Sequence, residues 1–581
     1  MTARRSPKKW LVSEPDQALT AELASALGVS PIVAGLLVAR GHHDLDSARA
    51  FLTPSLDQLH DPLLMRGMTD AVMRLLHAID NHEPILIYGD YDVDGTTGTA
   101  VLLRALRMLG GTAGYHVPHR FTEGYGIQQA GLEKAVRDGY KLVVSVDCGI
   151  RAHEPLLWAR ANGLDIIITD HHLPDEDEGS PPALAVLNPN QHGCNYPDKS
   201  LAGVGVAFKL IHALFRERGR EAQVPGFLKM VAIGTVADVA KLSGENRAIV
   251  ALGLADLPRA VNPGLRALID IAGCGDDGEM TAYDLGFRIG PRINAAGRMD
   301  AARAVIELFE AKEKAEARRL AEHLDTRNSE RKEVQREIFN RAIEEFESGP
   351  ERTAQTHAAV IAGDGWHRGV IGLAASKIAE RLNRPCVVIS LDGDVGHGSA
   401  RSIQAYHLFD GLTVCRDLLD KFGGHSHAAG LAIRREHIPE FRRRLNEHAA
   451  SCLTEEDLEP VLAIDCEVSP QSIGFALARD LSALEPFGAG NPRPVFATRA
   501  FRVLGEPQIL KEQHLKLRVA GDDNRPIEAI WWRGGEESER TPKANDRIDL
   551  AYELEANRWH GDIRVQLNVK DMKVAQTSVC E

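Results

Sequence analysis

Tyr88-Gly-Asp-Tyr-Asp-Val-Asp-Gly-Thr-Thr-Gly-Thr-Ala100 is the most informative stretch of this sequence. The apolar run Ile85–Tyr88 leads into it, and the run Ala100–Leu109 that follows is typical of a helix. This order predicts a strand, a tight turn and a helix, the arrangement in which open α/β sheets form ligand sites. Three aspartates occupy alternate positions in the turn: Asp90, Asp92 and Asp94. Carboxylates this close repel one another, so a compact site needs a cation among them; an acidic turn wholly in water is the alternative.

Length and composition indicate an ordinary globular protein of several domains. The 581 residues are too many for one hydrophobic core and predict three or four domains. No apolar run reaches the length that spans a membrane. The eight cysteines are scattered without a C-x-x-C pair, which favours reduced thiols in a cytoplasmic protein and offers no zinc-ligand pattern. Because the formal net charge is −14, nucleic acid would have to bind in a local basic groove.

Strands and helices alternate from about residue 76 to residue 240. Four strands are predicted there: Pro84–Tyr88, Lys141–Val146, Asp165–Thr169 and Ala183–Leu187. Their continuous Val, Ile and Leu content is typical of strands buried on both faces of a parallel sheet. Each strand ends at polar residues, which include Asp147, Asp170-His171-His172 and Asn188-Pro189-Asn190. Because the carboxyl ends of such strands meet in one crevice, we expect these side chains to gather there.

The remaining segments predict a helical start, a long helix and two further domains. Residues 1 to about 75 are typical of short helices with a packing role. Ala301–Ser348 contains neither Gly nor Pro and has an amphipathic period, which predicts one long helix; an interruption near Thr326–Ser329 stays open. A second α/β domain with glycine-rich turns is expected from about 357 to 450. Residues 461–581 alternate short β-like runs with turns, which indicates a small β-barrel.

The acids and histidines form a set of ligands that suits hard divalent cations. Asp147 ends one strand, Asp170-His171-His172 ends the next, and Asp238 lies in the run Ala232–Val239. Carboxylates and imidazoles without thiols favour Mn²⁺ or Mg²⁺ over structural zinc. A pair of such ions stabilises the attacking and leaving oxygens of phosphoryl transfer and generates hydroxide near neutral pH. A lone His-His pair is more often structural, but its position after a strand and an aspartate favours catalysis.

This motif set resembles that of the DHH phosphoesterase family. Further motifs are similar to the RecJ branch of that family, the bacterial exonucleases that digest single-stranded DNA in the 5′→3′ direction. They are Val117-Pro-His-Arg-Phe-Thr-Glu-Gly-Tyr-Gly126, Gly290-Pro-Arg-Ile-Asn-Ala-Ala-Gly-Arg298, Phe422-Gly-Gly-His-Ser-His-Ala-Ala-Gly430 and Phe487-Gly-Ala-Gly-Asn-Pro-Arg-Pro494. Gly98, where the family pattern has serine or alanine, is a small departure that affects no ligand.

The resemblance implies a role for each residue of the acidic set. Two Mn²⁺ or Mg²⁺ ions would be held by Asp92, Asp94, Asp147, His171 and Asp238. Asp90 is either a further ligand or an acid beside the ligands. His172 would face the scissile phosphate, and Asp170 would orient the two histidines. Because imidazole must be neutral to bind a metal ion, activity should fall in acid.

The resemblance also implies a surface that binds the DNA strand. The 5′-phosphate end would be recognised by Arg120, Arg292, Ser399 and Arg401, and structural salt bridges are the alternative for each arginine. The second α/β domain resembles the DHHA1 domain, whose glycine-rich turns approach phosphates. Two such turns are expected, at Gly396–Ser402 and Gly423–Gly430, and the residues concerned in the second are Gly423, Gly424, His425 and His427. The last domain resembles an oligonucleotide-binding (OB) barrel, in which Trp531, Trp532 and Trp559 would stack on bases or fill the core.

The sequence therefore predicts an α/β protein whose main domain has a parallel sheet. Its expected parts are a helical N-terminal segment at 1–75, a DHH catalytic domain at 76–300, a long connecting helix at 301–350, a smaller α/β DHHA1 domain at 351–455 and an OB-type β-barrel at 456–581. The expected activity is two-metal hydrolysis of single-stranded DNA, 5′→3′, to 5′-mononucleotides, in DNA repair and recombination. We expect a cytoplasmic monomer without membrane contact. The family implies single-strand-binding protein and a RecQ-type helicase as partners.

Two other functions fit parts of this pattern. One is a DHH phosphodiesterase that acts on short oligonucleotides, cyclic dinucleotides or pyrophosphate. The barrel-like tail argues against it, because small substrates need no module that holds a strand. The other is a catalytically inactive replication scaffold. The intact acids and histidines argue against that function, because a scaffold could lose them.

Overall fold

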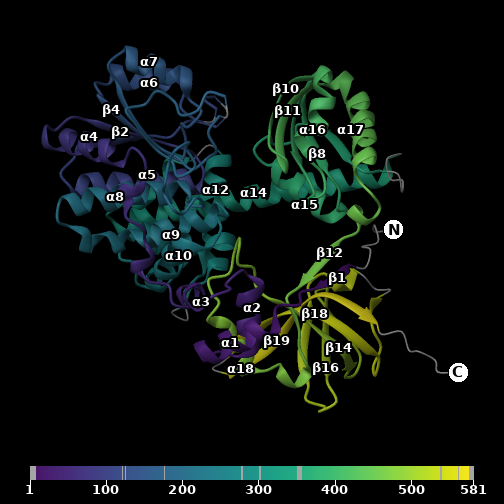
Figure 1. Ribbon diagram of the computed structural model, residues 1–581. Helices are drawn as coiled ribbons and strands as arrows, with labels where there is room; N and C mark the ends of the chain where they lie inside the picture. The colour runs from purple at the N-terminus through teal and green to yellow at the C-terminus, as the bar shows by residue number, and fades with distance from the viewer. Residues whose placement is uncertain are drawn as a thin grey trace. The chain divides into compact units, whose positions relative to one another are not determined.

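The computed structural model describes residues 8–120, 122–124, 126–175, 177–275, 279–299, 302–349, 356–536, 540–559 and 562–574. The chain divides into two compact units (Figure 1). The central unit comprises Asp46–Glu330 and Leu484–Pro492, and the flanking unit comprises Met1–Leu45, Arg331–Ala483 and Arg493–Glu581. No helix within the described residues combines the length and the apolar character needed to cross a membrane.

The central unit is built on a parallel sheet of five strands. These are β2 (Ile85–Gly89), β3 (Ala113–His116), β4 (Leu142–Val146), β5 (Asp165–Thr169) and β6 (Ala185–Leu187), in the order β3-β2-β4-β5-β6. The four predicted strands are confirmed. The edge strand β3 was not predicted, because its sequence Ala-Gly-Tyr-His is short and only half-buried, without an apolar run.

Helices cover both faces of this sheet. Successive residues of a strand point to opposite sides, so Ile87 and Tyr88 enter two different apolar cores. One face packs against α4 (Met68–Asp80), α5 (Val93–Met108) and α8 (Gly203–Glu217), and the other against α6 (Gln129–Arg137) and α7 (His153–Ala161). The same unit contains α9 (Leu228–Ala237), α10 (Gly244–Asp256), α11 (Pro263–Ala272), a π-helical turn (Asp284–Ile289) and α12 (Gly290–Arg298). Helix α3 (Leu45–Leu52) begins where the central unit begins.

The predicted long helix is two helices, α13 (Ala302–Glu310) and α14 (Lys314–Ser348). The break lies before Lys314, and α14 runs without interruption through Thr326–Ser329. Phe309 at the end of α13 and Ala311 in the short connection are both buried in the hydrophobic core of the central unit.

The flanking unit contains the second α/β domain. Its sheet has the order β10-β11-β9-β8-β7, with β7 (Ala359–Asp364), β8 (Cys386–Asp392), β9 (Val395–Arg401), β10 (Leu419–Gly424) and β11 (Ala428–Arg434). Helices α15 (Ile371–Leu382) and the end of α14 pack on one face, and α16 (Leu408–Val414) and α17 (Ile438–Cys452) on the other. The predicted glycine-rich turn at Gly396–Ser402 is wrong: residues up to Arg401 form strand β9, where small residues allow close pairing with β8 and β11.

The C-terminal segment forms the predicted barrel. Its seven strands have the order β13-β14-β18-β19-β17-β16-β15, and a further pairing of β14 with β16 joins strands from opposite parts of that order. They are β13 (Cys466–Glu467), β14 (Val495–Val503), β15 (Gln508–Leu510), β16 (His514–Ala520), β17 (Ile527–Trp531), β18 (Arg547–Trp559) and β19 (Asp562–Val574), with α18 (Phe475–Ser482) between β13 and β14.

The first described element is a strand, which the sequence did not reveal. Strand β1 (Lys9–Val12) pairs in parallel with β12 (Val461–Ile464), and the indole of Trp10 donates a hydrogen bond of 2.7 Å to Asp571 in β19. Helices α1 (Gln17–Leu27) and α2 (Pro31–Ala39) follow. The prediction of short helices alone is therefore wrong at the start of the chain, where β1 packs with the barrel.

Candidate metal centre

The turn between β2 and α5 brings three aspartates together. Asp92 caps α5, and its Oδ1 accepts a hydrogen bond from the backbone N–H of Gly95 at 3.0 Å. A Cβ on Gly95 would lie 2.6 Å from the carbonyl oxygen of Asp90, so only glycine permits so tight a turn. The two oxygens of Asp94 accept hydrogen bonds of 2.7 Å from the first N–H groups of α8, which fixes this buried carboxylate in place.

Asp170 organises the two histidines that follow β5. Its Oδ1 accepts hydrogen bonds from the backbone N–H groups of His171 and His172, and it lies 2.7 Å from Nδ1 of the His172 ring. Asn188 and Asn190, which follow β6, donate side-chain hydrogen bonds of 2.8 Å to the carbonyls of His172 and His171. These two amides were not assigned a role from the sequence, although their position at a strand end could have suggested one.

The side chains of the acidic set meet at the carboxyl ends of β2, β4 and β5. Nε2 of His171 lies 3.2 Å from Oδ1 of Asp147 and 3.9 Å from Oδ2 of both Asp94 and Asp238. Three groups of side chains offer ligand atoms within 4.8 Å of one another: Asp147, His171 and His172; Asp94, His171 and Asp238; and Asp90, Asp92 and Asp147. Asp238 comes from the C-terminal end of α9, not from the sheet.

Burial and mutual repulsion disfavour the ionised form of these aspartates when no cation is bound. Burial, reinforced by the charge of Asp92, raises the pKa of Asp90 to about 8 and that of Asp94 to about 7. Burial and the charges of Asp94 and Asp92 raise the pKa of Asp238 to about 9. The pKa of Asp147 is also raised well above its ordinary value by burial and by the neighbouring aspartates.

The two histidines titrate differently. Burial and the adjacent His172 lower the pKa of His171 to about 4, so its imidazole is neutral and able to bind a metal ion near pH 7. Burial also disfavours the charged form of His172, but the hydrogen bond and the charge of Asp170 outweigh it and raise the pKa of His172. The lowered pKa of Asp170 is the counterpart of this pairing, since the hydrogen bonds that it accepts overcome its burial.

The residues present fit a pair of divalent cations. Oδ1 of Asp90 and Nε2 of His171 are buried and make no hydrogen bond within the described residues. A buried polar atom without a partner is costly, and a cation would satisfy both atoms while neutralising the carboxylates. Oxygen ligands with one or two imidazoles are the donor set that Mn²⁺ and Mg²⁺ accept.

Of the four residues predicted to recognise the 5′ end, two lie in the central unit and two in the flanking unit. In the central unit, the guanidinium of Arg120 lies 4.9 Å from the ring centre of Tyr91, next to Asp90. Arg292 is engaged in an ion pair of 2.8 Å with Asp325 and donates to the carbonyl of Arg288. The salt bridge that was the alternative for Arg292 is therefore present.

Ser399 and Arg401, in the flanking unit, lie on β9 against the start of α15. A Cβ on Gly372, in the first turn of α15, would lie 2.9 Å from Oγ of Ser399 and 3.2 Å from Nη2 of Arg401. The guanidinium donates to Oγ of Ser399 and to the carbonyl of Ala400, and burial lowers the pKa of Arg401. It makes no ion pair within the described residues. A half-buried cation beside a helix N-terminus is a favourable place for an anion.

Gly423, Gly424, His425 and His427 lie in and after β10, which pairs with β11. Gly424 pairs with Ala429, and the carbonyl of His427 accepts a hydrogen bond of 3.0 Å from the N–H of Ser402. The structure therefore brings this hairpin to the same end of the sheet as Arg401, whose partner on β11 is Ala428. Gly423 and Gly424 are strand residues, not turn residues as predicted; the turn comprises residues 425–427.

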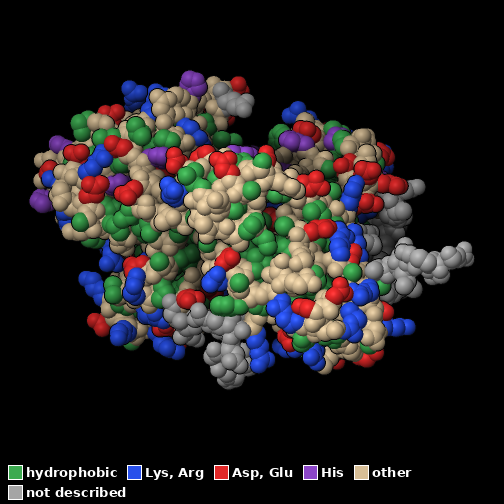
Figure 2. All heavy atoms as spheres, turned by 60° about the horizontal axis from the view of Figure 1, so that its bottom comes forward, with side chains coloured by type: hydrophobic (Ala, Val, Ile, Leu, Met, Phe, Trp, Pro, Cys, Tyr) green, Lys and Arg blue, Asp and Glu red, His purple; other side chains and the backbone are tan. Residues whose placement is uncertain are grey.

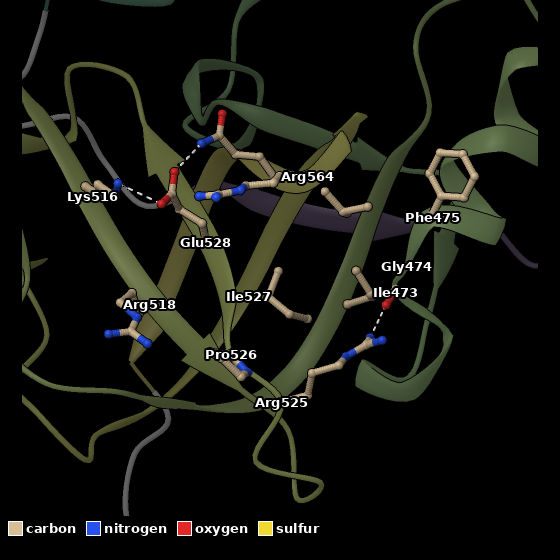
Figure 3. Close-up of a pocket in the computed structure, with 12 residues that line it drawn as sticks. Ile473, Gly474, Phe475, Lys516, Arg518, Arg525, Pro526, Ile527, Glu528 and Arg564 are labelled. Carbon is tan, nitrogen blue, oxygen red and sulfur yellow. Dashed lines mark hydrogen bonds and ion pairs between the residues drawn. The ribbon is translucent and has the colours of Figure 1, made fainter. Parts of the chain in front are cut away.

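A pocket of about 670 Å³ opens on the barrel (Figure 3). Ile473, Phe475 and Ile527 give it an apolar lining, and four basic side chains surround them: Lys516, Arg518, Arg525 and Arg564. Glu528 is the one acid of the lining, and it is engaged by Lys516 at 2.7 Å and by Gln566 at 2.6 Å. The pocket therefore combines an apolar surface with more basic than acidic side chains.

The tryptophans predicted as stacking platforms differ in exposure. Trp531 is buried at the end of β17, with the guanidinium of Arg540 over its ring at 5.0 Å, and has a core role. Trp532 is 53% exposed and lies edge-on to His514 at 4.8 Å between ring centres. The side chain of Trp559 lies outside the described residues.

Comparisons with known proteins agree with this architecture. The DHH family N-terminal domain matches residues 84–235, the DHHA1 domain matches 355–451, and the RecJ OB domain matches 464–571. The chain is 38% identical over 582 residues to the single-stranded-DNA-specific exonuclease RecJ of Bacillus subtilis (strain 168), covering 98% of this chain and 71% of that one. The RecJ of Escherichia coli (strain K12) is 35% identical over 536 residues, covering 87% and 90%.

Solved structures of RecJ also match this chain over nearly its whole length. The crystal structure of RecJ in complex with Mn²⁺ from Thermus thermophilus has a TM-score of 0.83 and 30% identity, covering 98% of this chain and 80% of that one. A second crystal structure of RecJ from the same organism was solved in complex with Mg²⁺. From the identity over nearly its whole length, the chain belongs to the RecJ family of single-stranded-DNA-specific exonucleases.

Proposed function

We propose that this protein is a metal-dependent exonuclease that degrades single-stranded DNA 5′→3′ to 5′-mononucleotides. The observation that carries the proposal is the cluster of buried aspartates and His171 at the carboxyl ends of the sheet strands, with raised carboxyl pKa values and buried atoms that no protein group satisfies within the described residues. Such a cluster, in a chain of this family, supports phosphodiester hydrolysis with two Mn²⁺ or Mg²⁺ ions.

Each residue of the centre has a part in this reaction. Asp92, Asp94, Asp147, His171 and Asp238 would hold the ions, with Asp90 as a further ligand or as an acid beside them. The bound ions would supply hydroxide at neutral pH and neutralise charge on the scissile phosphate. His172, whose side chain is 45% exposed, would contact the substrate phosphate, with its ring held in place by Asp170.

Digestion of end-labelled single- and double-stranded DNA is the direct test. Single strands should be degraded from the 5′ end with Mn²⁺ or Mg²⁺, and a chelator should stop the reaction. Cleavage of cyclic dinucleotides at a higher rate than of long single strands would favour a small-substrate phosphodiesterase instead. Absence of any cleavage by a folded, metal-loaded protein would favour the scaffold.

The 5′ end is proposed to be read by Ser399 and Arg401 at the start of α15. We expect Arg401→Ala to slow digestion of 5′-phosphorylated strands about ten- to a hundredfold more than that of 5′-hydroxyl strands, since a hydrogen bond to a charged group contributes about 1.5–3 kcal/mol. Initial rates on the two substrates measure this ratio. Arg434→Ala, on the neighbouring strand β11 and paired with Asp420, is the matched control. Equal slowing of both substrates would remove Arg401 from end recognition.

The barrel pocket is proposed to hold the strand by its phosphates and bases. The face shown in Figure 2 has basic and acidic side chains interspersed, so the local excess of cations at the pocket stands out against a net charge of −14. The guanidinium of Arg518 is exposed and makes no ion pair within the described residues. We expect Arg518→Ala to weaken binding of single strands of any sequence and to reduce the salt dependence of binding by about one phosphate contact.

Fluorescence anisotropy at several salt concentrations checks this prediction. Arg547→Ala, which removes a barrel arginine paired with Asp522 outside the pocket, is the control and should leave the salt dependence unchanged. Loss of affinity in both variants alike would show that the pocket has no special part in binding.

The domain boundaries, the oligomeric state, the protein partners and the location are further proposals. We infer the five-part division given above, with boundaries near residues 75, 300, 350 and 455. We also infer a monomer that acts with single-strand-binding protein and a RecQ-type helicase. The cysteines within the described residues form no disulfide, which supports the cytoplasm as the proposed location.

A further inference from the structure

The motif Phe487–Pro494 takes no part in the metal centre, although Ala489 within it bonds to Leu242, four residues after Asp238. Residues Leu484–Pro492, termed the tongue, belong to the central unit by their contacts, whereas the residues on both sides of them belong to the flanking unit. The tongue thus lies in the segment that precedes β14 of the barrel. It packs within the central unit, which contains the aspartates of the metal centre.

The tongue has a defined internal structure. The amide of Asn491 is buried and donates hydrogen bonds of 2.8 Å to the carbonyls of Leu484 and Pro486. Gly488 and Asn491 exchange backbone hydrogen bonds across a tight turn in which Gly490 has a φ of +73°. Asn491 therefore ties both arms of the tongue together.

The tongue contacts helix α10 and the segment that precedes it. The backbone N–H of Leu242 donates a hydrogen bond of 2.7 Å to the carbonyl of Ala489, and Leu242 is buried against Gly488. The guanidinium of Arg247, which is buried in α10, donates to the carbonyls of Glu485 and Pro486 at 2.7 and 3.3 Å. These contacts fix the segment that follows Asp238.

That segment begins with a strained residue. Val239 has a φ of +61°, and its N–H and that of Ala240 close α9 by bonding to the carbonyls of Val236 and Thr235. Glycine usually occupies this position of a helix end, because a β-branched side chain disfavours the left-handed conformation. Val239 is 70% exposed, so packing of its own side chain does not offset the strain. Such a conformation persists only where the surroundings impose it.

We propose that the tongue clamps the turn Asp238–Leu242 and thereby positions the carboxylate of Asp238 for metal binding. One side of the turn is fixed by α9, and the other by two anchors: Asn246, which donates to the carbonyl of Lys241 at 3.1 Å, and Ala489 of the tongue. The inference rests on the proposed role of Asp238 as a ligand. It makes Asn491 a positioning residue, since it acts through the shape of the tongue and touches no substrate.

Mn²⁺ binding to the full chain without DNA, measured by calorimetry, tests the clamp. We expect Asn491→Ala to weaken Mn²⁺ binding several-fold, because the tongue loses the bonds that tie its arms. Adding Val239→Gly to that variant should restore Mn²⁺ affinity, since glycine adopts the turn without a clamp. A loss of affinity that Val239→Gly does not restore would overturn the proposal, as would unchanged affinity of a folded Asn491→Ala protein.

Two reference variants separate the possible failures. Asn446→Ala removes an amide that accepts hydrogen bonds from the N–H groups of His357 and Ala358 in the flanking unit, and it should leave Mn²⁺ binding unchanged. Asp238→Asn should weaken Mn²⁺ binding; if it does not, the ligand role of Asp238 fails, independently of the clamp. If Asn491→Ala does not fold, Gly490→Ala replaces it, because a side chain is strained at this φ and would lie 3.3 Å from Cβ of Lys241.

Discussion

Asp147→Asn should abolish cleavage of single-stranded DNA while leaving the fold intact. Asp147 contributes an oxygen to two of the three possible ligand groups, so its loss affects both ions. Since metal ions contribute several kcal/mol to stabilising a phosphoryl-transfer transition state, the rate should fall on the order of a thousandfold or more. Asparagine is the suitable replacement because Asp147 has a φ of +63°, which asparagine tolerates and alanine does not.

The measurement is single-turnover cleavage with saturating Mn²⁺, together with a circular dichroism spectrum. Asp138→Asn, which changes an exposed acid at the end of α6, is the matched control and should cleave at the normal rate. Binding of single strands should survive in both proteins, since the barrel pocket is built from other residues. If Asp147→Asn keeps a substantial fraction of the rate, the two-metal assignment is wrong.

Removal of metal should make the central unit increasingly unstable as the pH rises. The pKa values of Asp94, Asp90 and Asp238 are raised to about 7, 8 and 9, above the roughly 3.9 of an unfolded aspartate. The folded state therefore binds more protons than the unfolded state between about pH 4 and 9, and the free energy of unfolding falls as the pH rises through that window. Each unit of pKa shift corresponds to about 1.4 kcal/mol per carboxyl group. Ionisation of the coupled cluster should therefore lower the free energy of unfolding by several kcal/mol across this pH range.

Thermal unfolding of the full chain at pH 6 and pH 8.5, with chelator or with Mg²⁺, measures this effect. The stabilisation by Mg²⁺ should be larger at pH 8.5, where the bare carboxylates must ionise. In Asp147→Asn the difference between the two pH values should shrink, because one of the repelling charges is gone. A stabilisation that does not change with pH would contradict the proton linkage.

The sheet and most of the acidic site could be predicted because both have local signatures. Continuous apolar runs such as Leu142–Val146 indicated strands buried on two faces, and the polar residue after each run marked its carboxyl end. Parallel strands bring these ends together without any further information, so Asp147 and His171 were placed in one site before the structure was known. Asp238 was recognised by resemblance, and its position at the end of α9 follows from tertiary packing that no local pattern shows.

The features that sequence analysis missed depend on partners far away in the chain. Strand β1 has only four residues and becomes a strand because β12 lies beside it. The segment at Gly396–Ser402 has the composition of a turn, but neighbours on both sides make it a strand. The strain at Val239 is invisible in the sequence, since no local pattern shows that this residue closes a helix with a positive φ.

The pairing of β1 with β12 also determines when the barrel can be completed in a cell. Trp10 is synthesised 561 positions before Asp571, the residue to which its indole donates a hydrogen bond. At roughly 5–20 residues per second, a ribosome needs about half a minute to two minutes to cover that interval. Until β12 has been synthesised, β1 has no partner strand, and its unpaired edge is open to other chains. Strand β1 is therefore made long before its partners and is among the last elements to reach its native place.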